Sequence, residues 1–293
     1  MNVKIKIGFL ISYDYAFLYD SLKLVYDFTD EIFLAIDINR RTWSGNQFYI
    51  EDSFFEYIEK IDIDKKIKIY QDDFYIEALS PIENDTRERN LLSEQMGENC
   101  WKLHIDVDEF FLNFDLIVDF LNKNKFLLFK PNQNQANIRA NWITLFKRTS
   151  KGFLYIDENE HFSFANNVVG KHVLARDLDA KGNTEIFTNF KAIHQSWARN
   201  PEEILIKITN WGHKNDFDSQ KYFDFWMSVN EENYMDFSYF HPYDSRIWKS
   251  LKYCECENLE DFIAKYNERN QPQKLPKLRT RLYKKHLKNI FRF

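Results

Sequence analysis

The sequence predicts an α/β fold in which a mostly parallel sheet is flanked by helices. Short apolar runs typical of buried strands alternate with segments whose apolar residues recur at helical spacing. Hydrophobic residues make up 44% of the 293 residues and aromatic residues 17%, with only 7 Gly and 6 Pro, which excludes collagen-like or disordered character. This length suits one large domain with an extension.

The elements predicted over the first 70 residues alternate between strand and helix. The first strand is predicted over residues 3–11 and ends at the polar turn Ser12-Tyr13-Asp14, where Ser12 or Asp14 could cap the next helix. That helix has an apolar stripe formed by Phe17, Leu18, Leu22, Val25 and Tyr26. A strand over 31–37, a loop over 39–47, a helix over 52–61 and a strand over 67–70 follow. Such alternation predicts parallel strands with helices on both faces.

The next helix is predicted to begin near residues 83–85, after the breaker Pro81, and to lead into an acidic strand. The strand over 102–111 is apolar, then acidic, then apolar, as expected of a buried strand that carries carboxylates to its C-terminal end. Asp106 and Asp108 lie two residues apart, so an extended backbone would direct both side chains to one face, where they could bind Mn²⁺ or Mg²⁺. The alternative is a strand end with a solvated acidic turn.

The carboxyl ends of several predicted strands carry polar residues. In an open parallel sheet, ligands bind beyond these ends. We therefore expect Ser12, Tyr13, Asp37 and the Asp106/Asp108 pair to share one crevice.

Several motifs occur in an order that resembles the family 2-like glycosyltransferases with the GT-A fold. Arg89-Asn90, Gly97-Glu98 and the strand ending in Asp106-Val107-Asp108 resemble their nucleotide-sugar-binding half, and the continuation Glu109-Phe110 resembles a subgroup with an Asp-x-Asp-Glu-Phe motif. The later motifs are Asn141-Trp142, Gly170-Lys171, the segment from Ile193 to Glu203, Lys207 and Trp211-Gly212-His213. Two departures are that Asp37 lacks the usual following Asp or Ser-rich turn, and that no Glu-Asp pair follows the acidic strand.

The resemblance implies a metal-dependent glycosyltransferase. It would move a sugar from a nucleotide-sugar donor to a glycan or lipid-linked acceptor, in the synthesis of bacterial surface polysaccharide. Asp108, with Asp106 acting directly or through water or the ribose, would hold the metal, and His194 would be its third protein ligand. Arg89 would contact the diphosphate or the base. The alternatives are a core or capping histidine at 194 and a solvated helix arginine at 89.

The general base stays open between five residues: Glu109, Asp157, Glu160, His213 and Asp216. Each is a carboxylate or imidazole that could take a proton from an acceptor hydroxyl. Two other functions compete with glycosyl transfer. One is a metal-dependent phosphohydrolase, which also uses clustered carboxylates. The other is a non-catalytic nucleotide- or carbohydrate-binding domain that lacks the base.

Residues 1–215 are predicted to form the GT-A-like domain and residues 216–293 an aromatic-rich helical extension. The aromatic residues could shape an acceptor pocket or pack as a core. From Lys274 to Phe293 the chain is basic, without acids, and predicts an amphipathic helix suited to an anionic membrane surface, or a solvated terminal helix. A net charge of −5 argues against a nucleic-acid partner.

The three cysteines, Cys100, Cys254 and Cys256, match neither a disulfide framework nor a zinc site. The apolar run over 7–11 is too short for a signal sequence or a membrane span. These observations favour a reducing cytoplasm, with peripheral contact at the inner face of the membrane.

Overall fold

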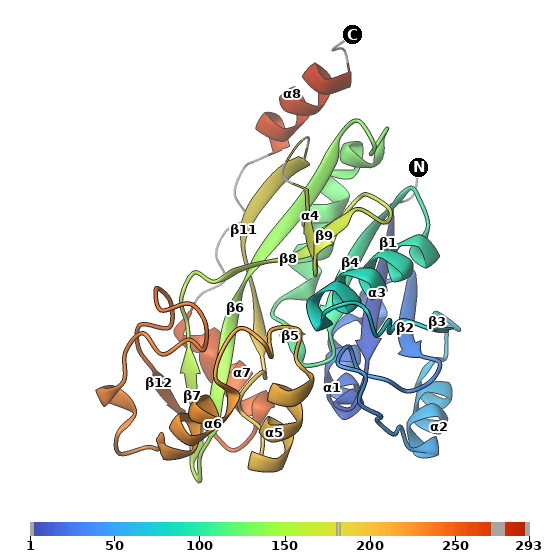
Figure 1. The fold of residues 1–293 in the computed structure, drawn as a ribbon. Coiled ribbons are helices and arrows are strands. Elements are labelled where there is room, and N and C mark those ends of the chain that lie inside the picture. The colour runs from blue at the N-terminus through green and yellow to red at the C-terminus, as the bar shows by residue number, and fades with distance from the viewer. Residues whose placement is uncertain (1–2, 180, 182, 271–278, 291–293) are drawn as a thin grey trace.

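The computed structural model describes residues 3–179, 181, 183–270 and 279–290 (Figure 1). The N-terminal part has strands β1 (Lys4–Ile11), β2 (Glu31–Asp37), β3 (Ile67–Asp72) and β4 (Cys100–Asp106), and helices η1 (Tyr15–Phe17), α1 (Leu18–Val25), η2 (Tyr26–Phe28), α2 (Asp52–Ile61) and α3 (Pro81–Met96). The middle has β5 (Glu109–Phe111), α4 (Phe114–Lys123), η3 (Lys125–Leu128), β6 (Gln135–Arg148), β7 (Gly152–Ile156), β8 (His161–Asn166), β9 (His172–Leu174), β10 (Asp177–Leu178) and β11 (Asn183–His194). The C-terminal part has α5 (Pro201–Asn210), α6 (Ser219–Ser228), η4 (Tyr234–Asp236), β12 (Lys252–Glu255), α7 (Leu259–Arg269) and α8 (Arg279–Ile290).

The central sheet is mixed, which confirms the predicted α/β class. Its strands follow the order β12-β7-β6-β8-β4-β1-β2-β3, and β11 pairs with both β5 and β6. The strands from β4 to β3 are parallel, as predicted, whereas β8, β7 and β12 join antiparallel. Figure 1 shows β6 and β11 running along the molecule, with α5 near one end and α8 near the other.

Helices cover both faces of the parallel strands because successive side chains point to opposite faces. On one face, Ile7 and Phe9 pack in a core with Leu18 of α1 and Phe54 of α2. On the other face, Leu10 packs in a separate cluster with Leu92 of α3. The contact with α3 is close at Gly8, where an added Cβ would lie 2.6 Å from the Leu92 side chain.

Three local expectations are wrong. The strand predicted over 102–111 ends at Asp106, because Val107 and Asp108 form a turn before β5. Neither Ser12 nor Asp14 caps α1, which begins at Leu18 without a side-chain cap. Pro81 does not precede the third helix but is its first residue, after a capping box formed by Ser80 and Glu83.

The C-terminal extension, predicted to be helical, also supplies a strand. β12 pairs with β7 through four residue pairs and forms the edge of the central sheet, so the extension is joined to that sheet. The predicted basic helix is present as α8, while Lys274, Lys277, Phe291 and Arg292 of the same prediction lie outside the described residues. Among the helices described here, none combines the length and apolar character needed to cross a membrane.

Candidate functional site

A cavity of about 300 Å³ lies at the carboxyl ends of β1, β2 and β4. As predicted, residues at the ends of these strands share it, including Ser12 and Tyr13 after β1 and Asp37 at the end of β2. Asp106 and Asp108 also line it, together with His194 at the end of β11 and Lys207 of α5. The cavity therefore brings together segments that are far apart in the sequence.

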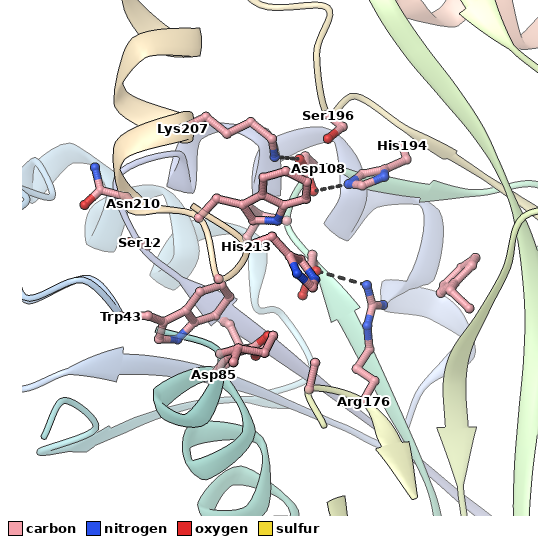
Figure 2. Close-up of a pocket in the computed structure, with 18 of the residues that line it drawn as sticks. Ser12, Trp43, Asp85, Asp108, Arg176, His194, Ser196, Lys207, Asn210 and His213 are labelled. Carbon is pink, nitrogen blue, oxygen red and sulfur yellow. Dashed lines mark hydrogen bonds and ion pairs between the residues drawn. The ribbon is translucent and has the colours of Figure 1, made fainter. Parts of the chain in front are cut away.

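Asp108 lies between cationic and imidazole side chains (Figure 2). Its Oδ2 accepts a hydrogen bond of 2.5 Å from Arg199 and lies 3.9 Å from Lys207 Nζ. Its Oδ1 lies 3.6 Å from His194 Nε2. Burial opposes ionisation, but His194, Lys207 and Arg199 hold the pKa of Asp108 well below its ordinary value. Asp108 is therefore a buried carboxylate that stays charged.

The turn that carries Asp108 is held by contacts with the segment after β11. The backbone N–H of Gln195 donates to the Asp108 carbonyl at 2.9 Å. Arg199 also donates to Asp14 at 3.0 Å, which links the end of β1 to the same turn. These contacts explain why the acidic strand breaks at residue 107 and why Asp14 does not serve as a helix cap.

Asp106 is held by two arginines. Arg89 of α3 donates to its Oδ1 at 2.9 Å, and Arg176 donates to its Oδ2 at 3.0 Å. Arg176 stands on the turn between β9 and β10 and also donates to both oxygens of Glu109, at 2.8 and 2.7 Å. Both oxygens of Asp106 are thus engaged by guanidinium groups, whereas Oδ1 of Asp108 faces His194.

Of the three predicted metal ligands, Asp108 and His194 form a close pair, whereas Asp106 is bound by two arginines instead. Asp108 Oδ1 and His194 Nε2 are close enough for both to lie about 2.1 Å from one ion. Burial lowers the pKa of His194 to about 4 against the attraction of Asp108, so the imidazole is neutral and can donate a lone pair. Within the described ranges, no group of three or more His, Cys, Asp or Glu side chains is gathered as an ion site. The pair would therefore need ligands from the substrate.

The hydrogen-bonded network around Asp106 and Asp108 contains one more carboxylate than cations. Five carboxylates form the network: Asp14, Asp85, Asp106, Asp108 and Glu109. Four cations face them: Arg89, Arg176, Arg199 and Lys207. When all are ionised, the network has one excess negative charge, and a diphosphate would add about two more unless a cation accompanied it.

The other residues predicted to bind the donor differ in whether their polar atoms already have hydrogen-bond partners. Both oxygens of Asp37 accept backbone N–H groups, from Asn39 and Arg41 on one side and Phe74 and Tyr75 on the other, so Asp37 shapes its loops. Ser12 Oγ and Arg89 Nη1 are buried without a partner in the part of the chain described. Burial raises the pKa of Tyr13, which keeps its hydroxyl protonated. These free donors remain available to a ligand.

The five candidates for the general base differ in their position relative to the cavity and in their partners. Glu109 is 1% exposed and is held by Arg176 and by the indole N–H of Trp142 at 2.8 Å. Asp157 is paired with Lys191 at 2.7 Å and does not line the cavity. Glu160 and His213 do line it, and Asp216 lies behind His213, with its Oδ2 2.7 Å from Nδ1 of that residue.

Comparisons with known proteins identify no family. No protein-family model matches the chain, and no curated protein matches it. Among solved structures, the chain is similar to the "Crystal structure of mannose-6-phosphate isomerase from Helicobacter pylori", at 13% identity and a TM-score of 0.32. The match covers 53% of this chain and 56% of that chain. A TM-score this low carries no argument about fold or function.

Proposed function

We propose that the protein is a metal-dependent glycosyltransferase of the GT-A type. It would transfer a sugar from a nucleotide-sugar donor to a glycan or lipid-linked acceptor, in the synthesis of bacterial surface polysaccharide. The observation that supports this best is the pair of Asp108 Oδ1 and His194 Nε2, 3.6 Å apart, in a cavity also lined by Arg89, Arg176 and Lys207. A cation-binding pair beside anion-binding side chains suits a diphosphate and its counter-ion.

The residues around this pair have separable tasks. A bound divalent ion would supply Lewis-acid stabilisation to the leaving diphosphate. Lys207 would bind phosphate oxygens and orient them, while Asp108 and His194 would hold the ion. Arg89, whose Nη1 has no partner in the described structure, would bind a further phosphate or base oxygen. Because these groups are already held in place, little reorganisation would accompany bond breaking.

A thermal-shift panel of nucleoside diphosphates and nucleotide sugars, each with and without Mn²⁺, tests this function. We expect a Mn²⁺-dependent rise in Tm with one nucleotide class. Asp108→Asn and His194→Gln should abolish the Mn²⁺-dependent part, whereas the surface variant Asp119→Asn should keep it. The Asp108 variant should fold because Arg199 retains its bond to Asp14. An unchanged shift in both site variants would reject the ion-binding pair.

Product assays with the ligands that raise Tm discriminate between the competing functions. A two-metal phosphohydrolase would release phosphate from a phosphomonoester, and it would need more metal ligands than this pair. A binding domain would show the shift without releasing nucleoside diphosphate when acceptor is added. A Mn²⁺-dependent shift together with sugar transfer would establish the proposed function.

A lipid-linked acceptor would be consistent with the basic helix α8. The side chains of Arg281, Lys284, Lys285 and Lys288 are exposed, and they would contact an anionic membrane surface. Leu282 and His286 are buried, and the ring of His286 lies 5.4 Å from that of Phe126 in η3. Because Leu282 and His286 pack on the protein, binding of α8 to a membrane would depend on its basic face. It would not depend on insertion of Leu282 into the lipid.

A further inference from the structure

Part of the cavity lining is built from aromatic rings. Trp211, His213, His241, Tyr243 and Trp248, here called the aromatic wall, all line it. The rings form a continuous series, with centroid distances of 5.1 Å for Trp211 and His213 and 4.6 Å for His213 and Tyr243. His241 continues it at 4.4 Å from Tyr243 and 4.5 Å from Trp248. Most of these residues come from the extension, so the extension supplies one side of the site.

Trp248 adopts a backbone conformation that is rare for an aromatic residue. Its φ is +56°, in the left-handed region, and its side chain is 3% exposed. Strained residues of this kind persist only where the surroundings hold them, and they cluster at ligand sites. Here the indole N–H donates to Glu160 Oε2 at 2.8 Å. This left-handed conformation places the indole against a carboxylate that lines the cavity.

Glu160 is rigidly placed but keeps one oxygen free. It immediately precedes β8, and its carbonyl accepts the backbone N–H of Trp142 at 3.0 Å. Its Oε1 accepts no hydrogen bond from the described residues, and Glu160 lines the cavity beside the aromatic wall. Aromatic faces next to a free carboxylate oxygen are complementary to a sugar, whose C–H faces stack on rings and whose hydroxyls donate.

We propose that the aromatic wall binds a sugar ring of the acceptor and that Glu160 accepts the proton of the attacking hydroxyl. This inference rests on the proposed glycosyl transfer. The hydroxyl oxygen forms a bond to the anomeric carbon of the donor sugar, and its proton passes to Glu160. The bond from that carbon to the diphosphate oxygen breaks, and its electron pair leaves with the nucleoside diphosphate.

The environment of Glu160 predicts the pH dependence of this step. Burial, aided by Glu158 and Asp244, raises the pKa of Glu160 to about 7, while the Trp248 indole opposes the rise. Tyr243 also faces this carboxylate, and its hydroxyl stays protonated because burial and the charge of Glu160 raise its pKa. A base must be ionised to accept a proton, so transfer should fall as the pH decreases below about 7.

His213 is the competing base in this part of the cavity. Its Nδ1 is 2.7 Å from Asp216 Oδ2, which leaves Nε2 for a substrate. However, the partner of His213 is exposed, with 52% of the Asp216 side chain accessible, whereas Glu160 is half-buried. We assign His213 to the aromatic wall because its ring is stacked on Tyr243 at an interplanar angle of 24°.

Variants at these residues test the assignment by release of nucleoside diphosphate. The donor is the nucleotide sugar selected by thermal shift, and methyl glycosides of glucose, galactose and mannose serve as acceptor probes. Glu160→Gln keeps an acceptor for the Trp248 indole, so it should fold. We expect it to reduce kcat by about 100-fold or more and to remove the acid limb near pH 7, without changing the donor-induced shift in Tm. Tyr243→Ala should instead raise the KM of the probe about tenfold.

Matched controls separate base removal from structural damage. Glu158→Gln lies two residues away and outside the cavity lining, so it should keep full transfer above pH 8. Its acid limb should move to lower pH, because Glu158 raises the pKa of Glu160. Tyr49→Ala, at a residue 73% exposed, controls for Tyr243→Ala.

The outcomes distinguish this inference from the proposed function. A wild-type protein that binds no nucleotide sugar would reject the proposed function itself. Donor binding and transfer that persist unchanged in Glu160→Gln would reject only the base assignment. Transfer that is lost in His213→Gln, with an unchanged KM, would also overturn it and would assign the proton to the imidazole. Equal KM values for Tyr243→Ala and wild type would reject the acceptor subsite.

Discussion

Replacing Arg176 with Met should destabilise the protein because it leaves a buried carboxylate without its cation. Arg176 donates to both oxygens of Glu109, which is 1% exposed. After the substitution, the Glu109 side chain would keep only the Trp142 indole N–H and the backbone N–H of Asp106. Removing one partner of a buried ion pair typically costs about 3–5 kcal/mol.

This cost converts into a measurable change in Tm. The unfolding entropy of about 2.1 cal/mol/K per residue, over 293 residues, is about 0.6 kcal/mol/K. A loss of about 3–5 kcal/mol therefore lowers Tm by about 5–8 °C. Calorimetry or circular dichroism would measure it. Arg246→Met, which removes an arginine with an 86% exposed side chain from an ion pair, should leave Tm unchanged.

A double variant tests whether the unpaired charge of Glu109 causes this loss of stability. Glu109→Gln is uncharged yet can still accept the Trp142 indole N–H, so adding it to Arg176→Met should recover much of the lost stability. The coupling energy from the double-mutant cycle should be about 2 kcal/mol or more. Additive effects of the two substitutions, or a loss below about 1 kcal/mol in Arg176→Met, would refute the reasoning.

Two further predictions concern pH and membranes. Burial raises the pKa of Glu88 to about 8, although the Trp43 indole N–H donates to it at 2.6 Å. Because the unfolded chain releases this proton near pH 4.5, stability should be lost as the pH rises from about 4.5 to 8. Urea unfolding of Glu88→Gln should show a shallower loss, and an equal slope would contradict the assignment. In α8, Lys284→Glu with Lys285→Glu should weaken binding to phosphatidylserine vesicles at low salt, unlike Lys221→Glu; equal binding would contradict membrane contact.

The sequence was sufficient where local periodicity determines an element. The strand over 31–37 and the helix over 52–61 have the predicted bounds, because their apolar spacing is visible within a few residues. The turn at 107–108 was missed because its cause, the contact of Asp108 with Gln195 and Arg199, lies about 90 residues away. β12 was missed for the same reason, since it pairs with β7 about 100 residues earlier.

In the candidate site too, contacts between residues far apart in the sequence could not be predicted. The parallel topology was enough to predict that Ser12, Asp37 and the acidic pair share a cavity. The cations Arg176, Arg199 and Lys207 were not assigned to the network, because nothing in their local sequence shows which carboxylates they face. Only burial and partners separate the candidate bases: Glu109 is bound by Arg176, whereas Oε1 of Glu160 has no partner among the described residues.

Trp142 contacts both the charged part and the aromatic part of the site. Its ring is stacked on His194 at a centroid distance of 4.8 Å, and its indole N–H is bound to Glu109. Its backbone N–H donates to Glu160, on the side of the aromatic wall. One residue thus contacts the imidazole of His194 and the backbone of Glu160, whose carboxylate is bound by Trp248. Under the proposed function, groups held in place in this way would need little rearrangement when a donor sugar binds.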